Sequence, residues 1–246
     1  MSQTSEPGSR GMARHEPGPA AGEPGSAGAL VAAIRHDLQA IDAQIRQHPY
    51  VQALHHGRVA RAALQAFPGH EYHIVRSDLR SLAALVHRFG QHPPTATFFN
   101  GVLQGEFAAL DGIVRFGRTL GLSEADLQAY EVTPEGFTYP SFMAWQAAYG
   151  SAAAVACGLL VNFAAWGHNC REMSAALRRH YGFSDADTVF LDSFASLPSF
   201  EAEVLAIIEE GLAQRVAAAE IRRAARLYQA YEKQFWDVLA VLAQLQ

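Results

Sequence analysis

Two carboxylates stand among apolar residues, where an ionised side chain is unfavourable. Glu232 lies in the segment "LYQAYEKQFWDVL", and Asp78 lies in "HIVRSDLRSLAAL". A buried carboxylate requires a partner, or it serves as an acid, a base or a ligand-binding group. The alternative is that both side chains point to water, with Lys233 marking the exposed side of its helix.

A second unusual pattern lies in "CGLLVNFAAWGHNC", residues 157–170, where polar side chains interrupt an apolar run. Asn162, Trp166 and Asn169 are separated by four and three residues, which places them near one face of a helix. Buried amides form hydrogen bonds. We therefore expect these side chains to contact either a neighbouring helix or a bound molecule.

The sequence contains none of the common catalytic or metal-binding motifs. It has no glycine-rich phosphate loop, no G-x-S-x-G, no H-E-x-x-H and no Cys/His spacing typical of zinc. In "HEYH", Glu71 and His73 are two residues apart and point in different directions on a helix. The glycines of "NGVLQGEF" lie within a helical pattern and indicate close helix packing rather than phosphate binding.

These residues are carried by a chain that is helical throughout. Apolar residues of "LVAAIRHDLQAIDAQIRQ" recur every three or four positions, which predicts one helix ending before Pro49. Ser123 with Asp126, and Ser184 with Asp187, predict two helix starts. The last two helices are expected at 198–214 and 217–244. Since no segment alternates with period two, we predict an all-α helical bundle with a site between facing helices.

Composition sets the domain organisation and excludes several classes of protein. Residues 1–28 are rich in Gly, Pro, Ser and Glu, so we expect a disordered segment followed by a single folded domain, 29–246. The net charge of −5 argues against nucleic-acid binding. No apolar segment is long enough to cross a membrane. The two cysteines, Cys157 and Cys170, exclude a disulfide framework and favour a cytoplasmic protein.

Several segments, in order, resemble one family. They are "HPYVQALHHGRV", "GEFAALDGIVRFGRTLGLSEADLQAYEVTPEGFTYPSF", "FLDSFAS" and "YEKQFWD". Over nearly all of residues 48–243 the chain is similar to the TenA/thiaminase II family and its relative PqqC. This resemblance implies a haem-oxygenase-like helical fold, a small-molecule substrate and a homo-oligomer.

The resemblance also implies roles for individual residues. Glu232 stands at the family's catalytic glutamate, three positions before the Phe of "FWD", and Asp78 is the candidate for the pyrimidine-binding aspartate. Tyr139 corresponds to the tyrosine before the nucleophile helix. The family's nucleophilic cysteine follows that tyrosine by 23 residues, and an aromatic residue follows four later. Those positions are Asn162 and Trp166 here.

Two further residues complete the expected substrate-binding set. Phe194 stands where the family has a later site tyrosine. Tyr228 aligns with a histidine of the di-iron oxidases that share the fold. Their motif H-x-x-x-D-x-x-H reads Tyr228, Glu232 and Phe235, and their E-x-x-x-x-x-x-H reads Glu106 and Ile113. Because the histidines are missing, we expect no metal and no other cofactor.

The absent cysteine puts the family's usual chemistry in question. A thiolate can add to a cationic heterocycle and split a C–N bond, whereas an amide cannot. Cys157 lies about 140° around the helix from Asn162, and Cys170 lies about 80° around and about 12 Å along it. Neither is expected to replace the thiol.

Four interpretations remain open at this stage. The first is a metal-free enzyme acting on a pyrimidine-like, thiamin-like or natural-product heterocycle by hydrolysis or oxidation, with Glu232 and Asn162 as its catalytic residues. The second is a PqqC-like or di-iron-type oxygenase or oxidase. The third is a non-catalytic ligand-binding or regulatory protein. The fourth assigns Asn162 and Asn169 to helix packing alone.

Overall fold

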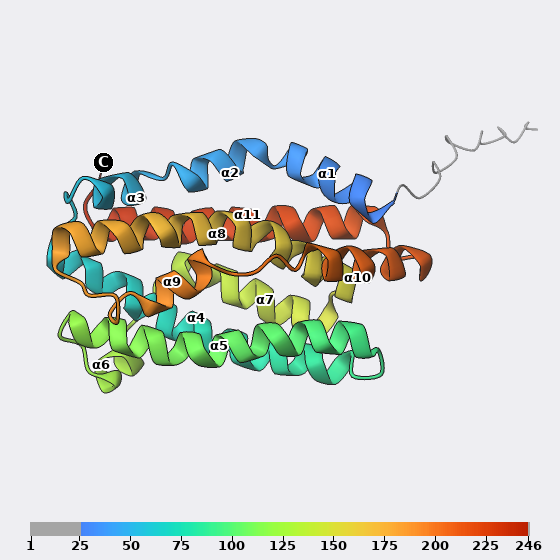
Figure 1. Ribbon diagram of the computed structural model, residues 1–246, viewed down its shortest axis with the longest axis horizontal. Helices are drawn as coiled ribbons and strands as arrows, with labels where there is room; N and C mark the ends of the chain where they lie inside the picture. Colours follow the sequence, from blue (N-terminus) through green and yellow to red (C-terminus); the bar gives the residue numbers. More distant parts are fainter. Residues whose placement is uncertain (1–25, 246) are drawn as a thin grey trace, which may run out of the picture.

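The computed structural model describes residues 26–245, and within them every regular element is helical (Figure 1). The α-helices are α1 (Ala27–Asp37), α2 (Gln39–Arg46), α3 (Pro49–His55), α4 (Ala66–Arg88), α5 (Pro93–Thr119), α6 (Glu124–Ala129), α7 (Thr138–Tyr149), α8 (Ala152–Tyr181), α9 (Val189–Ala195), α10 (Glu201–Ala213) and α11 (Ala218–Leu242). Short 3₁₀ helices span Arg61–Gln65 and Glu135–Phe137. The predicted all-α class is confirmed, and no helix of the described part is apolar and long enough to span a membrane.

The helices form a bundle around the long pair α8 and α11, which pack side by side (Figure 1). Helices α1 to α3 follow one long edge of this pair, and α4, α5 and α7 lie on the opposite side (Figure 1). Helix α9 contacts both α8 and α5. The space between the α8–α11 pair and the α4–α5 pair is where facing side chains can form a site.

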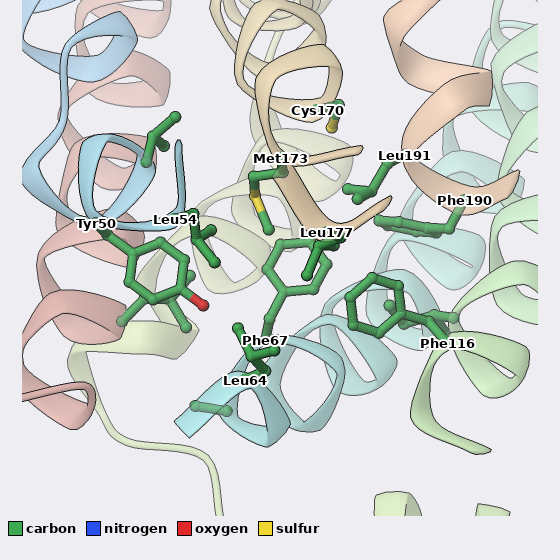
Figure 2. Close-up of a cluster of buried hydrophobic side chains, with 14 of the residues drawn as sticks. Tyr50, Leu54, Leu64, Phe67, Phe116, Cys170, Met173, Leu177, Phe190 and Leu191 are labelled. Atoms are coloured by element: carbon green, nitrogen blue, oxygen red, sulfur yellow. The ribbon is translucent and has the colours of Figure 1, made fainter. Parts of the chain in front are cut away.

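The core at one end of the bundle is rich in aromatic residues (Figure 2). Phe67 on α4 lies among Phe116, Phe190 and Leu177, which come from three other helices. The Phe67 and Phe116 ring centroids are 5.4 Å apart. Each such ring, when removed from water, contributes roughly 1.5–3 kcal/mol to folding. On α4 this packing lies one turn before Glu71, and the stacked rings of Phe67 and Trp166 join α4 to α8.

The N-terminal boundary differs slightly from the prediction. Residues 1–25 lie outside the described part, so the disorder expected over 1–28 is tested only at its end. Helix α1 already begins at Ala27, and Ser26 Oγ accepts a hydrogen bond from the Ala29 N–H at 3.3 Å. The single helix expected from Leu30 to Pro49 is wrong, because the chain bends at Leu38. This bend lets α1 contact α10 while α2 contacts α8 and α11.

Of the two predicted helix starts, only one is correct. Ser123 and Asp126 form a capping box on α6. Asp187 accepts hydrogen bonds from the Ser184 N–H and hydroxyl, but these residues close a turn, and α9 begins later, at Val189. Asp187 also accepts from the Thr119 hydroxyl at 2.8 Å, which ties this turn to the end of α5.

Candidate active site

A buried cavity of about 50 Å³ lies between the α4–α5 and α8–α11 pairs. Helices α4, α5, α7, α8, α9 and α11 all contribute to its wall. The lining residues are Glu71, Ile74, Val75, Asp78, Glu106, Tyr139, Asn162, Phe163, Trp166, Phe194, Glu232 and Phe235. Six of the seven site residues expected from the sequence are therefore brought together.

A chain of hydrogen bonds crosses the cavity wall from α7 to α11. The Tyr139 hydroxyl donates to Asn162 Oδ1 at 3.0 Å, and Asn162 Nδ2 donates to Glu232 Oε2. The other carboxylate oxygen, Oε1, accepts from Trp236 Nε1 at 3.1 Å. The two ends of the Asn162 amide are thus fixed, with its oxygen toward the tyrosine and its nitrogen toward the glutamate.

Glu232 is buried, with 3% of its surface exposed, so the alternative that it points to water is wrong. Lys233 instead points away and pairs with Asp237 at 2.7 Å. Burial raises the pKa of Glu232 to about 8, although the hydrogen bonds from Trp236 and Asn162 act in the opposite direction. A carboxyl group with a pKa near neutrality can both donate and accept a proton at physiological pH.

Three more carboxyl groups line the same cavity: Glu71 and Asp78 on α4, and Glu106 on α5. Burial is the main cause that raises their pKa values, to about 8 for Glu106. The neighbouring Glu106 carboxyl raises the pKa of the other two further. Among residues 26–245, no lysine or arginine lines the cavity. Asp78 Oδ1 is buried and has no hydrogen-bond partner among the described residues.

Aromatic rings form the remaining wall. The Trp166 ring is stacked on the Phe67 ring, on the side of the hydrophobic core. The ring centroids are 6.2 Å apart and the angle between the ring planes is 11°. Trp166 meets Phe194 edge to face, with ring centroids 5.9 Å apart. Phe163 contacts Phe194 in turn, at 6.1 Å. The cavity is therefore lined by flat aromatic rings together with carboxyl groups.

Tyr228 is the one expected site residue that the structure places elsewhere. Its side chain is fully buried, and its hydroxyl donates to Met143 Sδ at 2.9 Å. Its ring packs against Tyr139 at 5.5 Å, on the far side from the cavity lining. A Cβ at Gly158 would approach this ring within 2.2 Å, so the tyrosine occupies the space that this glycine leaves. Tyr228 supports Tyr139 and does not line the site.

Asn169 and the cysteines also lie outside the cavity. Asn169 Nδ2 donates to the Ile45 carbonyl at 3.0 Å, which joins α8 to α2. Its packing role is therefore confirmed. Cys157 and Cys170 are buried in the two hydrophobic clusters, as their angular positions predicted. Burial raises the pKa of Cys157 to about 12 and that of Cys170 well above its usual value, so neither is a thiolate near neutral pH.

Six lining residues are not predicted from the sequence: Glu71, Ile74, Val75, Glu106, Phe163 and Phe235. Glu71 and Asp78 are seven positions apart, which places them on one helix face, but Glu71 had been considered only beside His73. Glu106 had been considered only as a metal ligand. Phe163 follows Asn162 directly, and nothing in its spacing distinguishes it from a core residue.

The carboxyl cluster does not have the arrangement of a metal site. Within residues 26–245, no three side chains of His, Cys, Asp or Glu are placed so that they could hold one ion. Glu232 is occupied by hydrogen bonds from Asn162 and Trp236. No histidine lines the cavity.

Comparison with a family model completes the assignment. The model described as the TENA/THI-4/PQQC family matches residues 35–240. The chain belongs to this family. A search of curated proteins found no match.

Solved structures agree with membership of the TENA/THI-4/PQQC family. A TenA homologue from Pseudomonas syringae is 16% identical, with a TM-score of 0.75 over 87% of this chain and 93% of that one. A domain of unknown function from Shewanella denitrificans, described as having a heme oxygenase-like fold, is 12% identical, with a TM-score of 0.69 over 87% and 93%.

A third structure carries a different description. It is a TenA family transcription regulator from a Silicibacter species, 14% identical, with a TM-score of 0.66 over 87% of this chain and 96% of that one. At such low identities these likenesses show the fold alone. They establish the haem oxygenase-like, all-helical, single-domain architecture for this member of the family.

Proposed function

We propose that the chain is a metal-free enzyme that acts on a small protonated or cationic heterocycle carrying an amino group. A pyrimidine-like or thiamin-like ring, or a natural-product intermediate of the same chemistry, fits this description. The observation that carries the proposal is the hydrogen-bonded pair of Asn162 and Glu232 in a buried cavity with three further carboxyl groups and no lysine or arginine.

Glu232 is the general acid and base. Because burial raises its pKa to about 8, the protonated form can give a proton to a ring nitrogen and the ionised form can take it back. Asp78 Oδ1, which has no partner, is placed to accept a hydrogen bond from the amino group. Tyr139 and Trp166 supply ring faces for stacking.

Asn162 orients Glu232 and cannot form a covalent intermediate, so water takes the place of the thiolate in a hydrolytic reaction. The water oxygen attacks the carbon of a cationic C–N bond, and the electron pair of that bond moves to the leaving nitrogen. A carboxylate accepts the proton that the water loses. The cavity carboxyl groups stabilise the positive charge of the substrate before the bond breaks.

The test uses purified protein with thiamin, with an aminomethylpyrimidine analogue, and with the analogue plus oxygen. Product formation followed by mass spectrometry should fall at least about 100-fold in Glu232→Gln, as expected for loss of an acid/base group. Glu131→Gln, at an exposed position, is the matched control. If Glu232→Gln and Asn162→Ala both leave every activity and ligand affinity unchanged, the site is wrongly assigned.

A second variant tests the position of Asn162 in the site. Asn162→Cys places a thiol beside Tyr139 and Glu232, where the resemblance puts the family's nucleophile. We expect this thiol to react with iodoacetamide and to be protected by a bound pyrimidine. A thiol that reacts equally with and without ligand would contradict the assignment of this wall to the substrate.

A non-catalytic ligand-binding role is the second candidate. The observation that favours it is that both Glu232 oxygens already accept hydrogen bonds from protein donors. This role predicts that pyrimidine affinity is lost in Asp78→Asn while no product forms in the wild type under any of the conditions above.

A further inference from the structure

The cavity is too small for the ring that its chemistry favours. Its volume is about 50 Å³, whereas a protein cavity that accommodates benzene measures about 150 Å³. A ring therefore enters only if part of the wall moves. The carboxyl groups are buried, and Asn162 and Glu232 are also held by hydrogen bonds. Phe163 and Phe194 are partly exposed, so we take them as the movable part of the wall.

Behind these two rings lies a much larger groove, with a volume of about 1020 Å³. It runs between α5 on one side and α9, the 196–200 connection and α10 on the other. Glu106, Phe163 and Phe194 line both the cavity and the groove. The groove is thus the continuation of the cavity toward the surface.

The groove is apolar along its length. A series of neighbouring aromatic rings leads out of the cavity, in the order Phe194, Phe163, Phe200 and Phe98. The distances between successive ring centroids are 6.1, 6.0 and 5.7 Å. The exposed Leu197 also lines the groove, and within the described part of the chain Glu106 and Glu203 are the only charged residues that do. Such a surface favours an aliphatic or aromatic group over a polar one.

Two glycines keep the groove open. Gly101 and Gly105 lie one helical turn apart on α5, both exposed, and both line the groove. A Cβ built on either one meets no atom within 4 Å, so the close helix packing expected from "NGVLQGEF" is wrong. Glycine within a helix costs about 0.8–1 kcal/mol relative to alanine. Since no neighbouring helix requires these glycines, what they provide is space above α5.

We propose that this groove binds an apolar arm of the substrate, so that the ligand is an amphiphile: a cationic, donor-rich head in the carboxyl-lined cavity and a hydrocarbon or aromatic extension over Gly101 and Gly105. This inference rests on the proposed function, because the head defines where the arm begins. The residues shared by the two spaces favour one continuous ligand over a second protein copy in the groove.

The test uses methylguanidine, butylguanidine and octylguanidine as probes, with binding to the full chain measured by calorimetry. Methylguanidine tests the head site, and the longer chains test the groove. We expect affinity to rise about threefold to fourfold for each added methylene until the groove is filled, the gain that follows from burying a CH₂ group.

Gly105→Leu fills the floor of the groove without meeting another atom at Cβ. It should abolish the gain with chain length while the Kd of methylguanidine stays within about twofold of wild type. Gln104→Leu, on the same helix but outside the groove, is the matched control and should keep the full gain. Thermal melts and sedimentation velocity of each variant accompany the binding data.

The outcomes separate the two proposals. If methylguanidine does not bind wild type, or binds equally well to Asp78→Asn, the head site and the proposed function fail together. If methylguanidine binds but octylguanidine binds no better, only the groove proposal fails. It also fails if Gly105→Leu keeps the chain-length gain, or if Gly105→Leu changes the sedimentation coefficient, which would make the groove a subunit interface.

Discussion

Both ends of the Asn162 side-chain amide form hydrogen bonds within the protein, which fixes the orientation of this residue in the cavity wall. The Tyr139 hydroxyl fixes its oxygen, which turns its nitrogen toward Glu232. In this orientation the amide nitrogen donates to Glu232 Oε2, so the glutamate is the acceptor of this hydrogen bond. The tyrosine therefore positions Glu232, the proposed acid/base group, through the asparagine.

Removing the Tyr139 hydroxyl tests this relay. We expect Tyr139→Phe to lower kcat/KM, or ligand affinity, about 3- to 10-fold, since it removes one neutral hydrogen bond. The pH profile of the activity should also shift, because the contact between Asn162 and Glu232 loosens. A structural role alone would lower stability without moving that profile.

Tyr228→Phe is the matched control. It removes only the hydrogen bond to Met143 Sδ, which lies outside the cavity lining. Its thermal stability is expected to fall, and its pH profile should match wild type. Equal shifts in both variants would show that Tyr139 has no special place in the site.

Charged residues show how far the sequence alone could lead. Asp78 and Glu232 were found because carboxyl groups stood out among apolar residues, and both are buried as expected of functional groups. Glu71 and Glu106 are also carboxyl groups, but their neighbours in the sequence include both polar and apolar residues, so they do not stand out. The four carboxyl groups meet because α4, α5 and α11 face one another in the bundle. The spacing of residues within one helix does not predict which helices will face each other.

At the scale of elements, the close approach of α8 and α9 positions Phe194. A Cβ at Gly167 would lie 2.7 Å from the Phe194 carbonyl oxygen, so a backbone atom rather than a flexible side chain opposes any larger residue. The contact brings α9, and with it the ring shared by cavity and groove, against α8.

Gly167→Ala should therefore destabilise the protein by about 1–3 kcal/mol in denaturant unfolding, the usual effect of overpacking. It should also alter ligand affinity, because α9 must move. Gly101→Ala is the contrasting change and should stabilise the protein by about 0.5–1 kcal/mol, since no atom opposes its Cβ. Equal effects of the two substitutions would contradict this account of the glycines.

Helix identity was predictable from periodicity, whereas helix ends depended on tertiary contacts. The bend at Leu38 interrupts an apolar pattern that continues through it, because α1 and α2 pack on different partners. The turn at Ser184 has the residues of a capping box, but Asp187 also bonds to α5. In both places a distant contact overrides the local signal.

For the whole molecule, the buried carboxyl groups make stability depend on pH. Glu232 has a pKa of about 8 in the folded protein and the ordinary value of 4.5 when unfolded. Between these values the folded state binds the proton that the unfolded state has released. Stability therefore falls as pH rises from about 5 to 8, and it levels off once the group ionises in the folded state too.

Comparison of wild type with Glu232→Gln isolates this effect from that of the other titrating groups. The free energy of unfolding of the variant, relative to wild type, should increase on the order of 3 kcal/mol between pH 5 and pH 9. Urea unfolding at a series of pH values measures it, and Glu131→Gln serves as the exposed control. A difference that does not change with pH would show that Glu232 titrates normally.

Metal content is a second property of the whole chain. We expect less than about 0.1 equivalent of iron, manganese or zinc per chain by elemental analysis, since Glu232 is hydrogen-bonded within the protein and the di-iron histidines are absent. Treatment with EDTA should leave activity and melting temperature unchanged. Stoichiometric iron that restores activity after its removal would replace the metal-free interpretation.

The cluster of four carboxyl groups couples the binding of a cation to the release of protons. Burial raises the pKa of all four groups, and it raises those of Glu106 and Glu232 to about 8. A cationic ligand stabilises the ionised forms, so it enters as protons leave. We therefore expect the affinity for such a ligand to rise with pH, and calorimetry in buffers of different ionisation enthalpy should count the protons released for each ligand bound.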